Sequence, residues 1–237
     1  MGRIHRYRTA LSRHHRSAGF GIHSPFAFNF VRGVLRERLP YYEYDNIARL
    51  HQAVKATKHR QEPLISKKDA KMLFRIANYF NPSHLLVTGT RHGISVASMM
   101  AVSSQSHLYL YEPRLSGKRI AEELIEPFRG ATDCFSDLAT ALSSYRAAVG
   151  HGEAPFLLLN ELPGDADDEE QLKPFLFDVI EHTGVVIMTH LDQNRDTSQL
   201  WRLCEQRMPH GQSFTNEKIG IIVANPKLNV EHFFLWF

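Results

Sequence analysis

The stretch Leu85-Leu86-Val87-Thr88-Gly89-Thr90-Arg91-His92-Gly93-Ile94-Ser95 decides the fold of this chain. An apolar run stops at Gly89, polar residues follow, and a second glycine at Gly93 opens a segment of helical character that reaches Ala101. This order predicts a strand, a tight turn and a helix. Glycine permits backbone angles that other residues resist, and a helix start offers unpaired N–H groups. The turn is therefore a candidate site for a polar or anionic ligand.

A carboxylate follows this turn at a spacing known from nucleotide-binding folds. The next apolar run begins at His107 and ends in Glu112, nineteen positions after Gly93. An acid about 20 positions beyond such a turn can accept hydrogen bonds from both hydroxyls of one ribose. The alternative is an ordinary strand-to-helix turn followed by a solvated acid at a strand end.

The bulk composition is that of a globular protein. The chain has 237 residues, of which 43% are hydrophobic and 22% charged, enough for one large domain with an N-terminal extension. A net charge of +3 does not by itself indicate a nucleic-acid partner. The sequence has no apolar run of membrane-spanning length and no apolar signal core behind the basic residues near its start. These features predict a cytoplasmic protein that does not enter a membrane.

The chain divides into three parts. Residues 1–22 form an arm rich in arginine and histidine. This arm is either solvated or, as the alternative, a tail that binds RNA or phosphate. Residues 23–82 are predicted to form helices that pack on the core and cover a sheet edge or the mouth of the site. Residues 83–237 form the core itself.

Helix boundaries in the second part are marked by local signals. Ser24 followed by Pro25 is a typical helix start, because serine caps the helix and proline suits its first position. Ser66 and Asp69 have the spacing of a capping box, and Asn81-Pro82 ends the helix that they begin. The last of these helices therefore leads directly into the first core strand.

Strands alternate with helices through most of the core. Apolar runs predict strands at 84–88, 107–112, 131–135, 155–160 and 184–189. The segments between them have one apolar side at helical spacing. Short apolar strands that alternate with amphipathic helices indicate an α/β fold with a mostly parallel, twisted sheet and helices on both faces.

The end of the chain changes character. Residues 211–215, 219–224 and 231–237 read as strands with no helix between them. They predict antiparallel C-terminal strands at one edge of the sheet. The tail from Phe233 to Phe237 is too apolar to extend into solvent. We expect it to pack against the fold, and a homodimer contact is the alternative.

The Gly-Thr-x-x-Gly turn and the acid after the second strand resemble the class I S-adenosylmethionine-dependent methyltransferases. Within them, the segment from Ile65 to Gly93 looks like the catechol and caffeoyl-CoA O-methyltransferase branch. The likeness extends to a group of uncharacterised bacterial methyltransferases that share the Gly-x-His-Ser-Pro-Phe motif at 21–26 and the paired tyrosines at 41 and 42. The resemblance implies a Rossmann-like methyltransferase fold, S-adenosylmethionine as cofactor and a small-molecule acceptor.

The same resemblance implies roles for individual residues. Glu112 would hold the ribose, Asp137 would contact the adenine, and Asn160 would lie near the sulfonium and the acceptor. Gly89, Thr90 and Gly93 of the turn would lie against the methionine part of the cofactor, and Arg91 and His92 between them are also expected to bind the cofactor.

The chain also departs from the family pattern. Val87 stands where the family has an acid that helps to bind the cofactor's amino group. In the metal-dependent O-methyltransferases carboxylates end the fourth and fifth strands, whereas this chain has Asn160, Thr189 and His190 there. A hard divalent cation prefers anionic oxygen ligands, so we expect a mechanism without a metal ion.

A methyltransferase must align donor and acceptor and exclude water. A hydroxyl or amine acceptor must also lose a proton, which histidine can take near neutral pH. By position His190, together with Asn160, is the catalytic candidate, and His92 and His23 are further histidine candidates. The alternative is that these histidines serve packing or lie on the surface.

Two other functions are compatible with the sequence. A catalytically silent methyltransferase-like domain, which binds a ligand or a protein partner, is favoured by Val87, Asn160 and Thr189, because fold does not settle function. An RNA methyltransferase would grip phosphate with the basic arm between Arg3 and Arg16, although the small net charge argues against a nucleic-acid partner.

Overall fold

The computed structural model describes residues 21–56, 63–125, 131–150 and 152–237. Apart from its last two residues, the predicted basic arm lies outside these ranges. The described residues form an eight-stranded sheet with the strand order β3-β2-β1-β4-β5-β7-β6-β8. The strands are β1 His84–Thr88, β2 His107–Tyr111, β3 Ala131–Phe135, β4 Phe156–Leu159, β5 Gly184–Met188, β6 Gln212–Thr215, β7 Gly220–Ala224 and β8 Glu231–Phe234.

The first five strands run parallel to one another. β1 pairs in parallel with β2 and with β4, β2 pairs with β3, and β4 pairs with β5. From β1 the sheet is extended in one direction by β2 and β3 and in the other by β4 and β5, so the direction changes between β1 and β4. In such sheets a crevice forms beside the carboxyl ends of the strands at this point. The prediction of a mostly parallel α/β sheet is confirmed.

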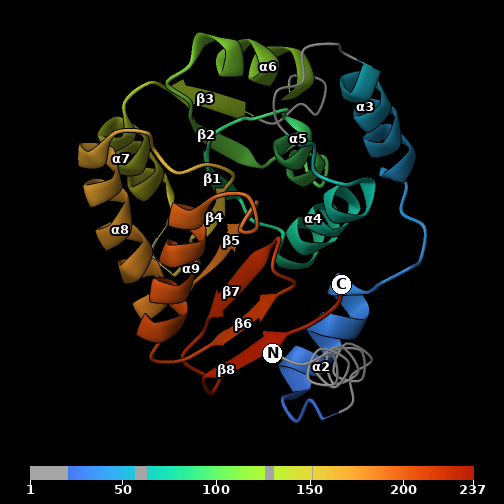
Figure 1. Ribbon diagram of the computed structural model, residues 1–237, viewed down its shortest axis with the longest axis vertical. Coiled ribbons are helices and arrows are strands. Elements are labelled where there is room, and N and C mark those ends of the chain that lie inside the picture. Colours follow the sequence, from blue (N-terminus) through green and yellow to red (C-terminus); the bar gives the residue numbers. More distant parts are fainter. Residues whose placement is uncertain (1–20, 57–62, 126–130, 151) are drawn as a thin grey trace, which may run out of the picture.

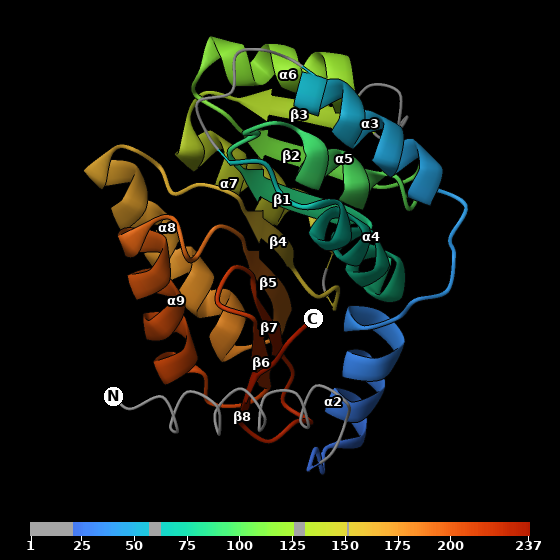
Figure 2. The same cartoon turned by 45° about the vertical axis from the view of Figure 1, so that its right-hand side comes forward.

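Helices cover both faces of this sheet (Figure 1). They are α2 Pro25–Phe30, the π-helix η1 Val31–Leu35, α3 Tyr44–Ala56, α4 Lys67–Phe80, α5 Ile94–Met100, α6 Leu115–Ile125, α7 Leu138–Ala148, α8 Ala166–Glu181 and α9 Arg195–Arg207. α7, α8 and α9 bury their apolar sides against one face, and α2, α4 and α5 pack on the other (Figure 2). Alternate strand residues point to opposite faces of the sheet. Leu86 therefore packs in the core under α7, α8 and α9, and Val87 packs in the core under α2, α4 and α5.

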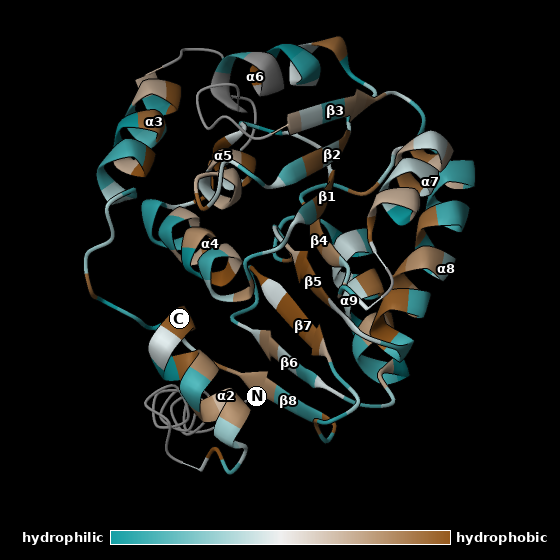
Figure 3. Ribbon diagram, turned by 180° about the vertical axis from the view of Figure 1, so that it is seen from behind, coloured by the Kyte–Doolittle hydropathy of each residue, from teal (hydrophilic) through white to brown (hydrophobic). Residues whose placement is uncertain are grey.

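The hydropathy of the strands follows their place in the sheet. β5 and β7 lie inside the sheet and are mostly hydrophobic in Figure 3, and all their residues are buried. β8 lies at the edge and mixes buried with half-buried and exposed residues. A strand that is covered on both faces needs apolar side chains on both, whereas an edge strand tolerates polar ones.

The C-terminal strands agree with the prediction in part. β7 runs antiparallel to both β5 and β6, as predicted, but β8 pairs with β6 in parallel. After β7 the chain passes across the end of β6 beside Gly211. A Cβ atom on Gly211 would lie 2.4 Å from the carbonyl oxygen of Val223. The φ angle of Gly211, +95°, also favours glycine at this position. The tail is packed as predicted, because Leu235 and Phe237 are buried.

The N-terminal helices are fixed to the core by aromatic packing and one buried arginine. The rings of Phe30 in α2 and Phe214 in β6 have centroids 5.1 Å apart. Arg75 of α4 donates to the carbonyl oxygens of Val34 and Leu35, the last turn of η1. A cation at a helix C-terminus satisfies carbonyls that have no partner in the helix. His23, ahead of α2, is exposed and lines no hollow of the site described below.

The described helices include none with both the length and the apolar character that crossing a membrane requires.

Candidate functional site

A cavity of about 760 Å³ opens where the central parallel strands end. Gly89 follows β1, Glu112 follows β2, Asn160 follows β4 and His190 comes shortly after β5, and all four line the cavity. Its size is within the usual range for small-molecule sites. The topology thus brings together residues as far apart in the sequence as Gly89 and His190.

The turn between β1 and α5 has the predicted strand, turn and helix order. Gly89, Arg91 and Gly93 have φ angles of +77°, +47° and +72°. Two of these left-handed positions are glycines, and the third is an arginine, which adopts this conformation at a cost in strain. The hydroxyl of Thr90 is buried and has no hydrogen-bond partner among the described residues.

Glu112 is fully buried and all its acceptor positions are filled. Its Oε2 accepts from the Thr90 N–H at 2.8 Å and from Nη2 of Arg114 at 3.1 Å. Its Oε1 accepts from the Arg114 backbone N–H at 3.1 Å and from Nε of the same residue at 2.9 Å. A carboxylate offers about four acceptor positions. Burial alone raises the pKa of Glu112, but the hydrogen bonds from Arg114 and Thr90 outweigh it and hold the pKa below its usual value.

Gly117 makes room for this carboxyl group. A Cβ atom on Gly117 would lie 2.2 Å from the carboxyl carbon of Glu112. Real atoms never approach so closely, so any larger residue at this position would displace the acid. The first turn of α6 is therefore built around Glu112.

Arg114 joins Glu112 to a second acid. Its Nη2 forms an ion pair with Oε2 of Glu161, and its Nη1 lies 3.4 Å from Oε1 of the same carboxylate. The backbone of Glu161 is fixed to β1, because its carbonyl accepts from the Thr88 hydroxyl at 2.6 Å. The hydrogen bond to Glu112 raises the pKa of Arg114, so its guanidinium stays charged.

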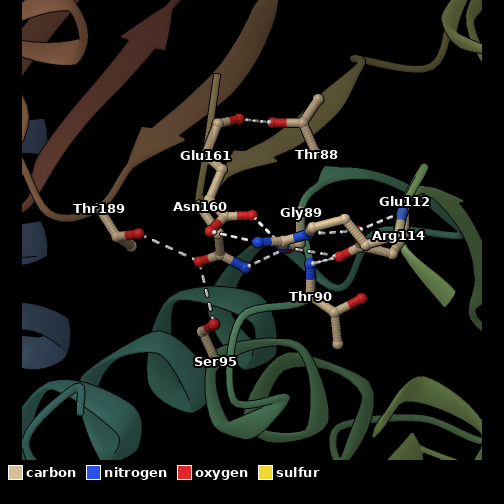
Figure 4. A network of polar contacts seen from close by, with 9 residues as sticks. All are labelled: Thr88, Gly89, Thr90, Ser95, Glu112, Arg114, Asn160, Glu161 and Thr189. Atoms are coloured by element: carbon tan, nitrogen blue, oxygen red, sulfur yellow. Dashed lines mark hydrogen bonds and ion pairs between the residues drawn. The ribbon is translucent and has the colours of Figure 1, made fainter. Parts of the chain in front are cut away.

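A neutral hydrogen-bond network lies beside these charges (Figure 4). The side-chain oxygen of Asn160 accepts from the hydroxyls of Ser95 at 2.9 Å and Thr189 at 3.0 Å. Its amide nitrogen donates to the carbonyl of Gly89 at 3.0 Å. Ser95, Asn160 and Thr189 are all buried. The network therefore ties together α5 and the ends of β1, β4 and β5.

The network also decides the tautomer of His190. The Thr189 hydroxyl gives its single proton to Asn160 and lies 2.7 Å from Nδ1 of His190. Nδ1 must then carry the proton that it donates to Thr189, which leaves Nε2 as an acceptor. Burial, with smaller contributions from Arg91 and His92, lowers the pKa of His190 to about 3. The imidazole is therefore neutral at physiological pH.

A second hollow of about 380 Å³ adjoins the cavity. Both are lined by Pro63, His190 and Gln193. The second hollow also reaches Asp69, in the first turn of α4, and Lys218, ahead of β7. His190 thus lies between two spaces that could each receive a molecule.

The structure brings most of the predicted site residues together. Gly89, Arg91, Glu112, Asn160 and His190 line the cavity. The other four predicted residues, three of the turn and the one assigned to the adenine contact, lie outside its lining.

Thr90 reaches the cavity only through its bond to Glu112. His92 and Gly93 are part of the turn but not of the cavity wall. Asp137 caps α7, accepting from the backbone N–H of Thr140 at 2.7 Å, and is exposed. Its contact with adenine stays a prediction.

Three residues of the site were missed by sequence reasoning. Arg114 comes two positions after Glu112, and Glu161 comes one position after Asn160. Glu112 and Asn160 were both predicted as site residues at strand ends. Ser95 lies in the first turn of α5, and the sequence does not distinguish it from Ser98, the other serine of this helix. A search for charged residues just after each strand end would have found the first two.

The described residues contain no group of three or more histidine, cysteine or acidic side chains in a metal-binding arrangement.

Comparison with known proteins bears on the fold. No family model and no curated protein matches the sequence. Solved structures do match, among them the O-methyltransferase TomG of Streptomyces achromogenes in complex with SAM, at 12% identity and a TM-score of 0.53, over 79% of this chain and 91% of that one.

Two further structures match at similar levels. The O-methyltransferase of Bacillus cereus in complex with SAH has 15% identity and a TM-score of 0.50, with 81% and 95% of the chains covered. A methyltransferase of Geobacter sulfurreducens has 14% identity and a TM-score of 0.50, with 81% and 96% covered. The similarity confirms the predicted Rossmann-like methyltransferase fold.

Proposed function

We propose that this protein transfers a methyl group from S-adenosylmethionine to a small-molecule acceptor. One observation carries the proposal: Glu112, buried at the end of β2, accepts from the Thr90 N–H of the Gly-Thr-x-x-Gly turn. The acid that we propose to bind the ribose is thereby held beside the turn that follows β1. The methyltransferase structures of the same fold, two of them with SAM or SAH bound, support this choice.

The residues present fit such a cofactor. The cavity of about 760 Å³ is large enough for a nucleoside with an amino-acid chain. The described part of its wall offers polar side chains that a cofactor of this kind needs, namely those of Glu112, Asn160 and Glu161. Glu112 would hold the ribose hydroxyls once the Arg114 guanidinium has moved aside.

When bound, S-adenosylmethionine would supply a methyl group on a positively charged sulfur. The protein's part is to hold donor and acceptor in line and to keep water out. Asn160 is suited to this task, because its amide links the ends of three strands and is itself held by Ser95 and Thr189. A side chain that is fixed in this way positions its surroundings without reorganising.

His190 is the residue that we propose to accept the acceptor's proton. Its unprotonated Nε2 belongs to a side chain that lines both hollows, so it can accept from a hydroxyl or amine bound in the smaller one. A pKa of about 3 makes it a weak base. It would therefore take the proton as the new bond to carbon forms, when the acceptor atom gains positive charge and becomes strongly acidic.

We further propose that no metal ion takes part. The strand ends after β4 and β5 carry Asn160, Thr189 and His190, which are neutral. Magnesium and calcium prefer carboxylate oxygens. The two acids that the described residues contribute to the cavity wall, Glu112 and Glu161, are both paired with Arg114.

The test is thermal unfolding of the protein with and without bound ligand. S-adenosylhomocysteine at a hundred times its dissociation constant should raise the free energy of unfolding by about 2.7 kcal/mol. Glu112→Gln should weaken binding about a hundredfold, because a neutral amide is a poor acceptor for two hydroxyls. Glu169→Gln is the matched control, since Glu169 pairs with Lys173 at 3.1 Å on α8 outside the cavity wall.

The second candidate is a silent domain that no longer uses the cofactor. It is favoured by the four filled acceptor positions of Glu112, which leave none for a ribose while Arg114 stays in place. Absence of any stabilisation by S-adenosylmethionine and S-adenosylhomocysteine would decide for this candidate. Stabilisation that Glu112→Gln abolishes would decide against it.

A further inference from the structure

The side-chain amide of Asn160 has a second N–H group that no described residue accepts. Its oxygen accepts from the hydroxyls of Ser95 at 2.9 Å and Thr189 at 3.0 Å, and its nitrogen donates to the Gly89 carbonyl at 3.0 Å (Figure 4). Within the described part of the chain this side chain makes no further hydrogen bond. An amide nitrogen carries two hydrogens, so one donor remains.

The partners of this amide fix its orientation. A carbonyl can only accept, so the atom that faces the Gly89 carbonyl must be the nitrogen. The hydroxyls of Ser95 and Thr189 then give their protons to the amide oxygen. Turning the amide over would set its oxygen against the oxygen of Gly89. The second N–H of Asn160 is therefore determined by the surrounding fold.

This donor belongs to the wall of the larger cavity. Asn160 is 2% exposed, and it lines the cavity of about 760 Å³ but not the second hollow. A buried donor without an acceptor destabilises a protein, and native structures normally supply a partner. Water or a ligand in the cavity must therefore provide the acceptor.

The strand order decides which part of a ligand passes Asn160. Glu112 follows β2, Asn160 follows β4 and His190 comes after β5, and β1 and β4 lie between β2 and β5 in the sheet. Neighbouring strands are about 4.8 Å apart. A cofactor whose ribose lies at Glu112 and whose methyl group faces an acceptor beside His190 thus passes Asn160 with the part around its sulfur. This part carries the amino-acid chain.

That part of S-adenosylmethionine has one group that can accept a hydrogen bond. The sulfonium and the ammonium are cations, which an N–H dipole repels, whereas a carboxylate offers about four acceptor positions. A charged acceptor also forms a stronger hydrogen bond than a neutral one. Charge alone selects no ligand here, because the charged side chains of the described cavity wall cancel. They are Arg91, Arg114, Glu112 and Glu161.

We propose that the second N–H of Asn160 donates to the carboxylate at the amino-acid end of the cofactor, and that this bond selects adenosyl compounds that carry the carboxylate. The inference rests on the proposed function, since it takes S-adenosylmethionine as the ligand. The new bond satisfies the buried donor and leaves the contacts of Asn160 with Ser95, Thr189 and Gly89 intact. Asn160 is therefore a binding and specificity residue that needs no rearrangement.

Two ligands isolate the carboxylate. S-adenosylhomocysteine carries it, and decarboxylated S-adenosylhomocysteine has the same adenosine, thioether and amine without it. Isothermal titration calorimetry of the wild type should show at least tenfold weaker binding of the decarboxylated ligand, a change of about 1.4 kcal/mol. Equal affinities would overturn the inference and leave the proposed function standing. A wild type that binds neither ligand would refute the proposed function together with this inference.

Nuclear magnetic resonance assigns the effect to Asn160. In the isotope-labelled wild type, one side-chain amide proton of Asn160 should move downfield with S-adenosylhomocysteine, because a hydrogen bond to a carboxylate deshields it. The decarboxylated ligand should not produce this movement. The side-chain amide of Asn46 in α3, outside the cavity wall, is the internal control and should move with neither ligand. The same movement of the Asn160 proton with both ligands would overturn the inference.

A substitution tests the same contact by affinity. Asn160→Asp replaces the amide nitrogen by a carboxylate oxygen, which repels the carboxylate of the ligand. In the folded variant, checked by circular dichroism, S-adenosylhomocysteine should bind at least tenfold more weakly, and the decarboxylated ligand should bind unchanged or more tightly. Asn46→Asp is the matched control and should change neither ligand. An equal loss for both ligands would overturn the role of Asn160, and the resonance test on the wild type decides where this variant does not fold.

Discussion

The cavity has two halves that are held together in different ways. The charged half consists of Glu112, Arg114 and Glu161, which are joined by ion pairs. The neutral half consists of Ser95, Asn160, Thr189 and His190, which are joined by hydrogen bonds among uncharged groups. Both halves lie at the same strand ends, yet only the charged half contains a side chain that is about half exposed.

The difference shows which half can change its partners. Arg114 can exchange Glu161 for water at small cost, because that ion pair is partly exposed, but it can leave the buried Glu112 only when a ligand takes its place. The hydroxyls and the amide of the neutral half have no water to replace a lost partner, so each broken bond leaves a buried polar group unsatisfied. We infer that the charged half rearranges when a ligand binds and that the neutral half stays fixed.

The largest effect is expected in the neutral half. Asn160→Ala removes the acceptor of Ser95 and Thr189 and the donor to the carbonyl of Gly89. We expect the free energy of unfolding to fall by about 3 kcal/mol, measured by urea denaturation. Asn46→Ala in α3 is the control, because Asn46 is only half-buried and bonds only to the nearby Glu43 and Arg49 among the described residues, and it should change stability by less than about 0.5 kcal/mol. Equal losses in the two variants would contradict a rigid neutral half.

A smaller effect is expected in the pH dependence of the free energy of unfolding, to which His190 contributes. Its pKa of about 3 lies below the value of about 6.5 in an unfolded chain, so unfolding takes up a proton below that pH. The stability contribution is complete above about pH 6.5 and is lost as the pH falls toward 3. Between pH 7 and pH 5 the wild type should lose about 2 kcal/mol more than His190→Gln. Parallel pH profiles would show that the histidine is not held neutral.

The smallest effect is expected in the charged half. Glu161→Gln breaks the ion pair with Arg114, whose side chain is 47% exposed and keeps its bonds to Glu112. We expect a loss of less than about 1 kcal/mol in the free energy of unfolding, measured by the same urea titration. A loss as large as that of Asn160→Ala would mean that both halves are equally rigid, and the distinction between them would fail.

The comparison also shows where sequence reasoning reaches the site. Gly89 and Glu112 could be predicted because a glycine turn and a strand-end acid leave a local pattern. Arg114 and Glu161 could not be paired in advance, since 47 positions separate them. The tautomer of His190 depends on Thr189 and Asn160, whose contact is made only when β4 and β5 are neighbours.

The secondary structure was largely determined by the sequence alone. Hydrophobic periodicity marked β1 to β5 and α7 to α9, because a strand and a helix each repeat their buried side at a fixed period. The cap at Ser66 and the end of α4 at Asn81 followed from local chemistry. The parallel pairing of β8 with β6 was not predictable, because the direction of an edge strand depends on where the preceding loop crosses the sheet.

The sequence thus determined which segments are strands and helices and which residues stand at the strand ends. Only the tertiary structure decided that Glu112 and Glu161 share one guanidinium and that Asn160 and Thr189 hold His190 neutral. The physical reason is the distance along the chain over which each interaction acts. Periodicity and capping act over a few neighbouring residues, whereas ion pairing and burial depend on contacts that exist only after distant strands have aligned.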